Sequence, residues 1–148
     1  MKGFTLIELM TVLGILSILA MISISIGPGM IQKSKERAEL REFISECRKS
    51  QMHAIKTNQN VVLKITGNSY QFFADPNKNF TLDPGEDQTI IRTFQRLEIT
   101  SITSVGKLAF DSRGICVADN KKIATPMAEI NFSNKYNLKI FLTGVIKV

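Results

Sequence analysis

A loop with many oxygen-bearing side chains is the first place where residue types and spacing suit a metal ion. The oxygens fall at positions 1, 3, 5, 9 and 12 of a twelve-residue stretch and come from Asp75, Asn77, Asn79, Asp83 and Glu86. This is the spacing of an EF-hand, and it suits calcium, which takes six to eight oxygen ligands. An EF-hand has glycine at position 6, where this sequence has Phe80, so a polar hairpin loop without a metal remains the alternative interpretation.

Two cysteines could form a covalent cross-link. Cys47 and Cys116 lie far apart in the sequence and lack the CxxC spacing of a zinc or redox site. They could pair as a disulfide if the domain lies outside the cytoplasm, whereas an unpaired cysteine often serves as a small buried apolar residue. The sequence leaves both interpretations open.

Familiar catalytic combinations do not occur in the sequence. His53 is the single histidine, and Cys47, six residues earlier, falls about 240° around a helix from it, so the two side chains do not form a pair within one helix. No Walker loop, GxGxxG, GxSxG or HExxH string is found. We therefore expect a protein that is not an enzyme.

The positive charge of the chain bears on its partners. The formal net charge is +6, and every charged residue except Lys2 and Glu8 lies from Lys33 onward. Such a field favours acidic partners, including nucleic acid. The charges are scattered, however, because adjacent basic pairs occur only at residues 48–49 and 121–122 and no aromatic platform lies among them. Nucleic acid is a partner that the sequence allows but does not favour.

A long uncharged segment near the N-terminus indicates insertion into a membrane. No charged residue occurs from Leu9 to Gln32, and a helix from Phe4 to Ile26 would be about 35 Å long, enough to cross a hydrocarbon core of about 30 Å. A secretory signal peptide fits less well, because its basic region would be Lys2 alone and no Ala-x-Ala cleavage site follows. We expect a membrane-spanning helix within residues 4–29.

Glu8 is the one acid within this apolar region. An ionised carboxylate costs roughly 2.5 to 3.5 kcal/mol at bilayer depth on insertion scales, so such a residue normally has a partner. Its place in the first helical turns also lets Glu8 complement the positive end of the helix dipole. The dipole alone accounts poorly for a carboxylate in a membrane, so we expect a further partner for Glu8.

The string KGFTLIEL at residues 2–9 resembles the type III signal of type IV prepilins and pseudopilins. In that family a peptidase on the cytoplasmic face cuts after the glycine and methylates the new N-terminal phenylalanine. The resemblance implies cleavage between Gly3 and Phe4, with methylation of Phe4. It also implies that Glu8 pairs with the N-terminal ammonium of a neighbouring subunit, which supplies the partner that a buried carboxylate requires.

A second helix follows the sequence Gly27-Pro28-Gly29, a combination that kinks or locally melts a helix. Helical periodicity runs from Met30 to about Lys56, with apolar residues at spacings of three and four. The apolar stripe consists of Ile31, Ala38, Leu40, Ile44, Cys47, Ala54 and Ile55. The pattern predicts an amphipathic stem helix over residues 30–57 that packs on the rest of the chain.

Short strand-like segments occupy the rest of the sequence. Alternating or β-branched residues predict strands at 61–66, 70–74, 89–94, 97–102, 107–110, 115–118, 128–132 and 138–142. One long helix followed only by strands predicts an α+β fold, in which the helix, transmembrane in its first half, packs on one or two antiparallel sheets. This order of elements is the pilin architecture.

Two further strings narrow the resemblance. Residues 50–65 and the sequence FDSRG at 110–114 resemble the H-type pseudopilins of type II secretion and the related FimT-like minor pilins. The FDSRG string predicts a turn between strands, and Arg113 within it is a candidate for a partner surface. FimT-like subunits of DNA-uptake pili bind DNA through a Gly-Arg-x-Arg pattern, but residues 144–147 read GVIK and lack both arginines.

The residues and the resemblance together predict four segments: a prepilin leader at 1–3, a transmembrane assembly helix at 4–29, a stem helix at 30–57 and a β-rich pilin domain at 58–148. The resemblance implies a minor pilin or pseudopilin of a type IV pilus or a type II secretion system. It implies a single pass through the inner membrane, a C-terminal domain on the periplasmic side, and other pilins and the prepilin peptidase as partners. The alternative is a DNA-binding minor pilin of a DNA-uptake pilus.

Overall fold

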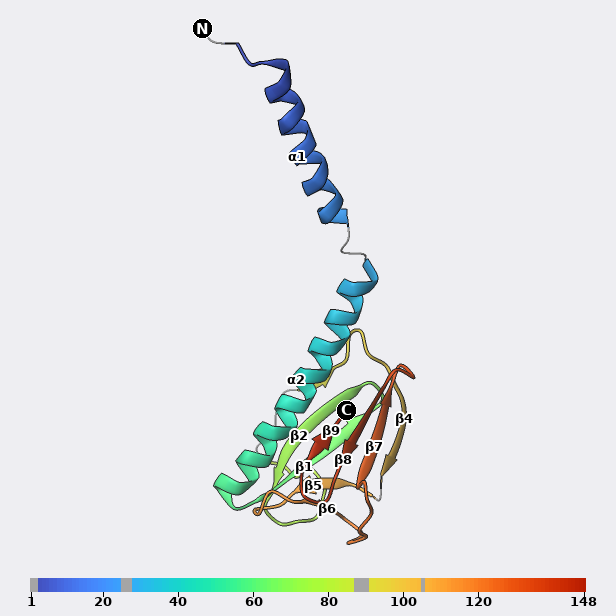
Figure 1. Cartoon of the computed structure of the whole chain (residues 1–148). Helices are drawn as coiled ribbons and strands as arrows, with labels where there is room; N and C mark the ends of the chain where they lie inside the picture. The colour runs from blue at the N-terminus through green and yellow to red at the C-terminus, as the bar shows by residue number, and fades with distance from the viewer. Residues whose placement is uncertain (1–2, 25–27, 87–90, 105) are drawn as a thin grey trace. The chain divides into compact units, whose positions relative to one another are not determined.

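The computed structural model of the chain describes residues 3–24, 28–86, 91–104 and 106–148, and Figure 1 shows its helices and strands. The chain divides into two units, residues 1–37 and 38–148. The boundary lies within the second helix, Pro28–Thr57. The first third of this helix therefore belongs to one unit and the rest to the other.

Two helices form the N-terminal part of the chain. Helix α1 spans Leu6–Ile24 and helix α2 spans Pro28–Thr57. The first is shorter than the predicted segment 4–29, and the second begins at a proline, which has its backbone angle preset for the first helical position. Of the predicted break, Pro28 and Gly29 lie in α2, whereas Gly27 lies outside the described residues.

Helix α2 buries one stripe of its surface, at alternating spacings of three and four. Within the unit 38–148 the stripe consists of Leu40, Phe43, Cys47, Ser50 and Ala54. The predicted stripe needs correction, because Ile31 and Ile55 are 46% and 44% exposed, and because it omitted Phe43, which is fully buried. Phe43 lies three residues after Leu40 and four before Cys47, so it shares their face of the helix.

The strands form two antiparallel sheets. The five-stranded sheet has the order β3-β2-β1-β5-β6, and the four-stranded sheet has the order β4-β7-β8-β9. The first consists of β1 (Asn60–Thr66), β2 (Ser69–Asp75), β3 (Arg92–Thr93), β5 (Leu108–Phe110) and β6 (Cys116–Ala118). The second consists of β4 (Ile99–Ser104), β7 (Ala128–Phe132), β8 (Tyr136–Ile140) and β9 (Ile146–Lys147). Each predicted strand overlaps one of these, and β9 is additional; residues 89 and 90 of one predicted strand lie outside the described part.

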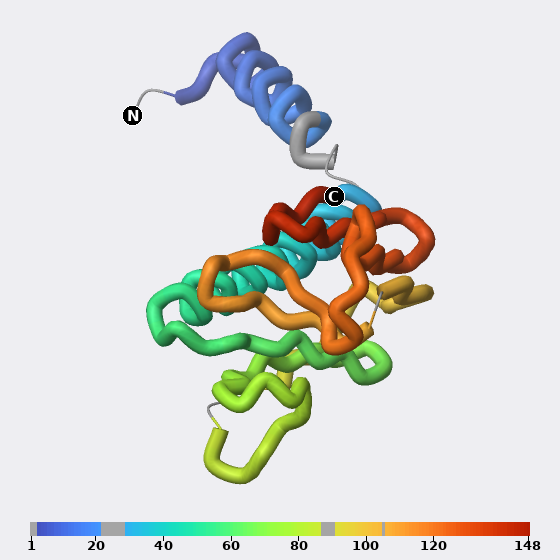
Figure 2. The backbone as a smooth tube through the Cα atoms, turned by 90° about the horizontal axis from the view of Figure 1, so that it is seen from below, coloured from blue at the N-terminus to red at the C-terminus, as the bar shows by residue number. Residues whose placement is uncertain are grey.

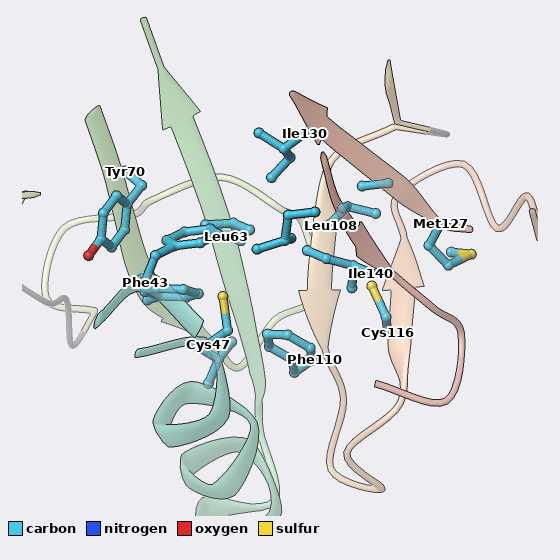
Figure 3. Close-up of a cluster of buried hydrophobic side chains, with 14 of the residues drawn as sticks. Phe43, Cys47, Leu63, Tyr70, Leu108, Phe110, Cys116, Met127, Ile130 and Ile140 are labelled. Atoms are coloured by element: carbon cyan, nitrogen blue, oxygen red, sulfur yellow. The ribbon is translucent and has the colours of Figure 1, made fainter. Parts of the chain in front are cut away.

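The main core of the domain forms around Phe43. Its ring centroid lies 4.7 Å from that of Tyr70, 5.6 Å from that of Phe94 and 6.2 Å from that of Phe132, all in edge-to-face geometry. Figure 3 shows Phe43 and Cys47 projecting from α2 toward Leu63, Phe110 and the strands behind them. Side chains from α2 and from both sheets therefore share one apolar core.

The five-stranded sheet has a second covered face. Val62, Phe73 and Ala109 are buried there, with Phe80 and Leu82 of the loop after β2 packed against them. Figure 2 shows this yellow-green loop on the side of the domain away from α2. The loop that the sequence suggested as a calcium site therefore also serves as an apolar cover for the sheet.

Candidate assembly and processing site

Gly3 and Phe4 precede the first helix and are open to solvent. The side chain of Phe4 is 83% exposed, and no atom lies within 4 Å of the position where a Cβ on Gly3 would stand. Neither residue belongs to a helix or strand. The predicted cleavage point is therefore accessible in the described chain, while Met1 and Lys2 of the predicted leader lie outside the described residues.

Thr5 directly precedes helix α1, and Glu8 lies in the first turn of that helix. The backbone N–H of Glu8 donates to the Thr5 hydroxyl at 3.3 Å and to the Thr5 carbonyl at 3.1 Å, so Thr5 caps the helix. The first turn therefore holds Glu8 at the positive end of the helix dipole. Within the described residues, the Glu8 carboxylate has no hydrogen-bond donor or cation of its own.

The surface of α1 is apolar and uncovered. Over residues 6–21 its large side chains are exposed by about half or more, from Val12 at 49% to Leu6 at 77%. A helix that is apolar on all sides needs lipid or other protein around it. Across the described ranges, no helix meets the length and hydropathy required of a membrane span.

The loop proposed for calcium is held by its own hydrogen bonds. The buried Asp75 carboxylate accepts the backbone N–H of Asn79 at 3.1 Å and that of Phe80 at 2.9 Å. The Asp83 carboxylate accepts the side-chain amides of Asn77 at 2.8 Å and Asn79 at 2.7 Å. Hydrogen-bond donors within the loop therefore already occupy the two aspartates.

The third acid of the loop is hydrogen-bonded as well. Glu86 bonds through one carboxylate oxygen to the backbone N–H of Asp83 at 2.8 Å. In the part of the chain that the structure describes, no three acidic, histidine or cysteine side chains come together as metal ligands. Asp75 organises the loop through its two backbone hydrogen bonds, and the calcium site stays a prediction.

Cys47 and Cys116 are free and buried, rather than joined in a disulfide. Both belong to the main core, where they act as small apolar residues. Burial raises the pKa of the Cys47 thiol far above its usual range; it also raises the pKa of the Cys116 thiol to about 12, with a contribution from the negative charge of Asp111. The thiols therefore stay protonated and unreactive at neutral pH.

The FDSRG string forms the turn that its composition predicted. The Asp111 carboxylate accepts the backbone N–H groups of Arg113 at 2.9 Å and Ile115 at 3.1 Å, and also contacts the Arg113 guanidinium at 2.7 Å. Gly114 has a φ of 77°, which favours glycine. Arg113 thus has a structural contact, although most of its side chain is exposed.

A second turn, in the segment suggested by analogy for DNA binding, lies against the first. Gly144 donates its N–H to Phe141 at 2.9 Å, as Gly114 does to Asp111 at 2.8 Å. A Cβ on Gly144 would clash with the Gly114 carbonyl oxygen, so the two turns touch. Residues 144–147 therefore end in a short strand packed on the domain, with Lys147 over the Phe141 ring.

His53 lies exposed on α2 and belongs to a basic surface. A shallow groove on the helix is lined by Ser45, Arg48, Lys49, Met52, His53 and Lys56. The nearby acid Glu46 pairs with Lys49 at 3.0 Å. The basic side chains of this face could attract an acidic partner.

Two polar residues that the sequence did not single out connect the elements. The Glu39 carboxylate on α2 accepts the backbone N–H groups of three successive residues, 95, 96 and 97, at 2.6 to 3.0 Å. Asn68, in the turn between β1 and β2, bonds to the same loop and to Ile99. Their partners lie about 30 to 60 residues away, so no local pattern in the sequence indicates them.

A capped apolar helix headed by Gly3-Phe4, followed by antiparallel sheets packed on a second helix, defines a pilin-like protein. The chain belongs to the family described as type II transport protein GspH, whose model matches residues 39–142, more than two-thirds of the chain. The prokaryotic N-terminal methylation motif matches residues 1–24. No curated protein and no solved structure matches the chain. The GspH family is structural. Its model covers most of α2 and strands β1 to β8, whereas the methylation motif covers α1.

Proposed function

We propose that the protein is a minor pilin or pseudopilin that is cleaved after Gly3, methylated at Phe4 and assembled into a filament through α1. The observation that carries this proposal is the combination of the methylation motif with a helix that has apolar side chains exposed on all sides. Covering a side chain such as Leu13 contributes roughly 1.5 to 3 kcal/mol. A row of such residues therefore favours packing against other subunits or lipid.

In this proposal Glu8 directs the register between subunits. Its carboxylate sits in the first turn of α1, three residues after the capping Thr5, and its donor comes from outside the described chain. After cleavage, the ammonium of Phe4 in a neighbouring subunit provides a cation of the right charge. The paired charges tolerate apolar surroundings that would destabilise either charge alone.

The same segment is proposed as the anchor before assembly. Residues 4–29 carry Glu8 as their one charged residue, and an inner-membrane location would cover the exposed side chains of α1 with lipid. The C-terminal domain would then lie on the periplasmic side. Partners in this proposal are other pilins and the prepilin peptidase, within either a secretion pseudopilus or a type IV pilus.

Mass spectrometry of the full chain tests the processing step. The protein is extracted from membranes of cells with and without a prepilin peptidase, and its intact mass and N-terminal sequence are determined. We expect loss of Met1-Lys2-Gly3 and a methylated Phe4 only in cells with the peptidase. An uncut N-terminus in both strains would overturn the proposal.

Substitution of Glu8 tests assembly separately. We expect Glu8→Gln to be cleaved as efficiently as the wild type but to reduce incorporation into filaments at least tenfold, because the neutral amide cannot pair with the Phe4 ammonium. Ser17→Ala is the matched control in the same helix, since the Ser17 hydroxyl bonds only to the backbone carbonyl of Leu13. Equal incorporation of both variants would contradict the role of Glu8.

DNA capture is a second candidate, favoured by the basic groove on α2. Arg48, His53 and Lys56 lie along one exposed face of that helix. We expect binding of duplex DNA to weaken steeply with salt, and Arg48→Glu with Lys56→Glu to weaken it more than tenfold. Lys121→Glu with Lys122→Glu, on an exposed loop, is the charge-matched control. No binding at low ionic strength would remove this function.

A further inference from the structure

Strand β4 is an unprotected edge of the four-stranded sheet. It pairs with β7 along one side and is the last strand in the sheet order. Its sequence is Ile-Thr-Ser-Ile-Thr-Ser, with no charge and no proline, and residues 100–104 are all exposed. Natural proteins usually protect edge strands with charges, proline or bulges, because free N–H and C=O groups invite another strand. In β4 the one such feature is a shift in the pairing register with β7, which lies at the start of the strand between Ile99 and Ser101.

A second strand edge is open nearby. Strand β1 pairs with β2 as far as Thr66, but it pairs with β5 only as far as Leu63. Lys64, Ile65 and Thr66 therefore have a neighbouring strand on one side and none on the other within the described residues. The end of β5 leaves a gap in the five-stranded sheet at this point.

A cavity of about 670 Å³ lies between these two edges. Its walls come from β1, β5, β4, β7 and the loop at residues 80–82, and they are largely apolar. Ile65 is partly buried and Ile102 is 43% exposed, so both side chains have room for further apolar contact. Ile102 and Ser104 line the cavity, whereas the intervening Thr103 does not.

Two lysines give the cavity a positive charge. Lys64 and Lys107 line it and are exposed, and neither ammonium has an ion pair among the residues that the structure describes. Asp119 accepts the backbone N–H of Lys107 at 3.2 Å and is not paired with its ammonium. A second copy of the chain would bring the same lysines, and its own β4 has no carboxylate, so charge favours a different protein as the occupant.

We propose that this cavity binds an extended segment of another protein subunit, which adds a strand to the free edge of β4. The segment has apolar side chains at alternate positions, which face Ile65 and Ile102, and a carboxylate that pairs with Lys64 or Lys107. Main-chain hydrogen bonds to β4 supply affinity, and the cavity and the lysines supply specificity. This interface is separate from the helix contacts of the proposed function and does not depend on cleavage of the leader.

Binding of a synthetic peptide to the full chain in detergent micelles tests the proposal. The probe is a fluorescent octapeptide that alternates threonine and valine and ends in aspartate, and binding is followed by fluorescence anisotropy. Two matched peptides have lysine in place of the aspartate, or proline in place of a central valine. We expect saturable binding of the first peptide, and at least tenfold weaker binding of both others.

Variants of the protein locate the site. We expect Ile102→Lys to weaken binding at least tenfold, and Thr103→Lys, on the opposite face of the same strand, to change it less than threefold. Lys64→Glu with Lys107→Glu should reverse the preference, so that the lysine peptide binds better than the aspartate peptide. Each of these side chains is exposed, and unchanged melting temperatures show that the fold is intact.

Three outcomes would overturn the proposal. They are no saturable binding up to millimolar peptide, equal binding of the proline peptide, and equal effects of the substitutions at 102 and 103. The charge reversal keeps the proposal testable even if one variant is poorly folded, because it requires a gain of binding rather than a loss.

Discussion

Helix α1 and the domain formed by residues 38–148 both contain many apolar side chains but place them differently. In α1 these side chains are exposed, and the single carboxylate has no partner in the described chain. In the domain, Phe43 and the side chains around it are fully buried, and Asp75 and Glu39 each accept two or more backbone N–H groups. The domain therefore buries most of its large apolar side chains within itself, whereas those of α1 are left uncovered. Changes in the two regions should accordingly affect different measurements.

The largest loss of stability is expected from Phe43→Ala. Removing this ring leaves a cavity among Tyr70, Phe94 and Phe132, and such changes destabilise by about 3 to 5 kcal/mol. Urea unfolding followed by circular dichroism measures the change. Met52→Ala, at a 52% exposed position of the same helix, should cost less than about 0.5 kcal/mol. Similar losses for both variants would show that Phe43 is not the centre of the core.

A smaller loss is expected from Glu39→Ala. The substitution leaves three backbone N–H groups of residues 95–97 without their acceptor, which we expect to cost about 1 to 3 kcal/mol in urea unfolding. Glu98→Ala removes an exposed acid close to the same loop and serves as the control. If the two variants had equal stability, the link between α2 and this loop would contribute nothing.

Asp75 allows a test of the two interpretations of its loop. Asp75→Asn weakens the acceptor for the N–H groups of Asn79 and Phe80 inside a buried site, so we expect a loss of about 1 to 3 kcal/mol. The loss should be the same with calcium and with a chelator. A melting temperature of the wild type that rises with calcium, but not in this variant, would instead support the calcium site.

Alkaline pH should weaken the domain gradually. Burial raises the pKa of Tyr70 to about 12, with a further contribution from the negative charge of Glu42, and burial raises that of Cys116 to about 12 as well. Because the folded pKa exceeds the unfolded one, the protonated forms stabilise the fold below about pH 9 to 10, and this contribution is lost as pH rises toward 12. Urea unfolding at several pH values should show a smaller decline in Tyr70→Phe. An equal decline in both proteins would remove Tyr70 as a cause.

The smallest change in unfolding is expected in α1. Leu13→Ala alters a side chain that is 55% exposed, so the free energy of unfolding of the domain should change by less than about 0.5 kcal/mol. Incorporation into filaments should nevertheless fall, because neighbouring subunits would lose apolar contact. If this variant lost domain stability but still assembled normally, the expected difference between α1 and the domain would be wrong.

Local patterns allowed much of the fold to be predicted. The period of two in the strands and the period of three to four in α2 depend on neighbours in the sequence, so eight strands and the helix were recognised. The turn at FDSRG followed from the same kind of information, since Asp111 bonds to residues two and four positions later. Phe43 was omitted although it fits the helical period.

The polar contacts between elements were not predictable in this way. In the sequence, Glu39 cannot be distinguished from an ordinary exposed acid of an amphipathic helix. Its role depends on the folded chain, which places residues 95–97 beside it. The spacing of oxygens in the loop after β2 suggested calcium, but the same side chains bond to donors within the loop. Spacing alone does not show whether an oxygen faces a cation or a backbone N–H group.

The sequence by itself determined the N-terminal signal, the apolar helix that follows it and the order of one helix region before many strands, because each is written in adjacent residues. Only the tertiary structure decided which sheet each strand joins, that β4 and the end of β1 remain open edges, and that Lys64 and Lys107 line one cavity. These features depend on contacts between residues distant in the sequence and on the residue at which a neighbouring strand ends. Local periodicity contains information about neither.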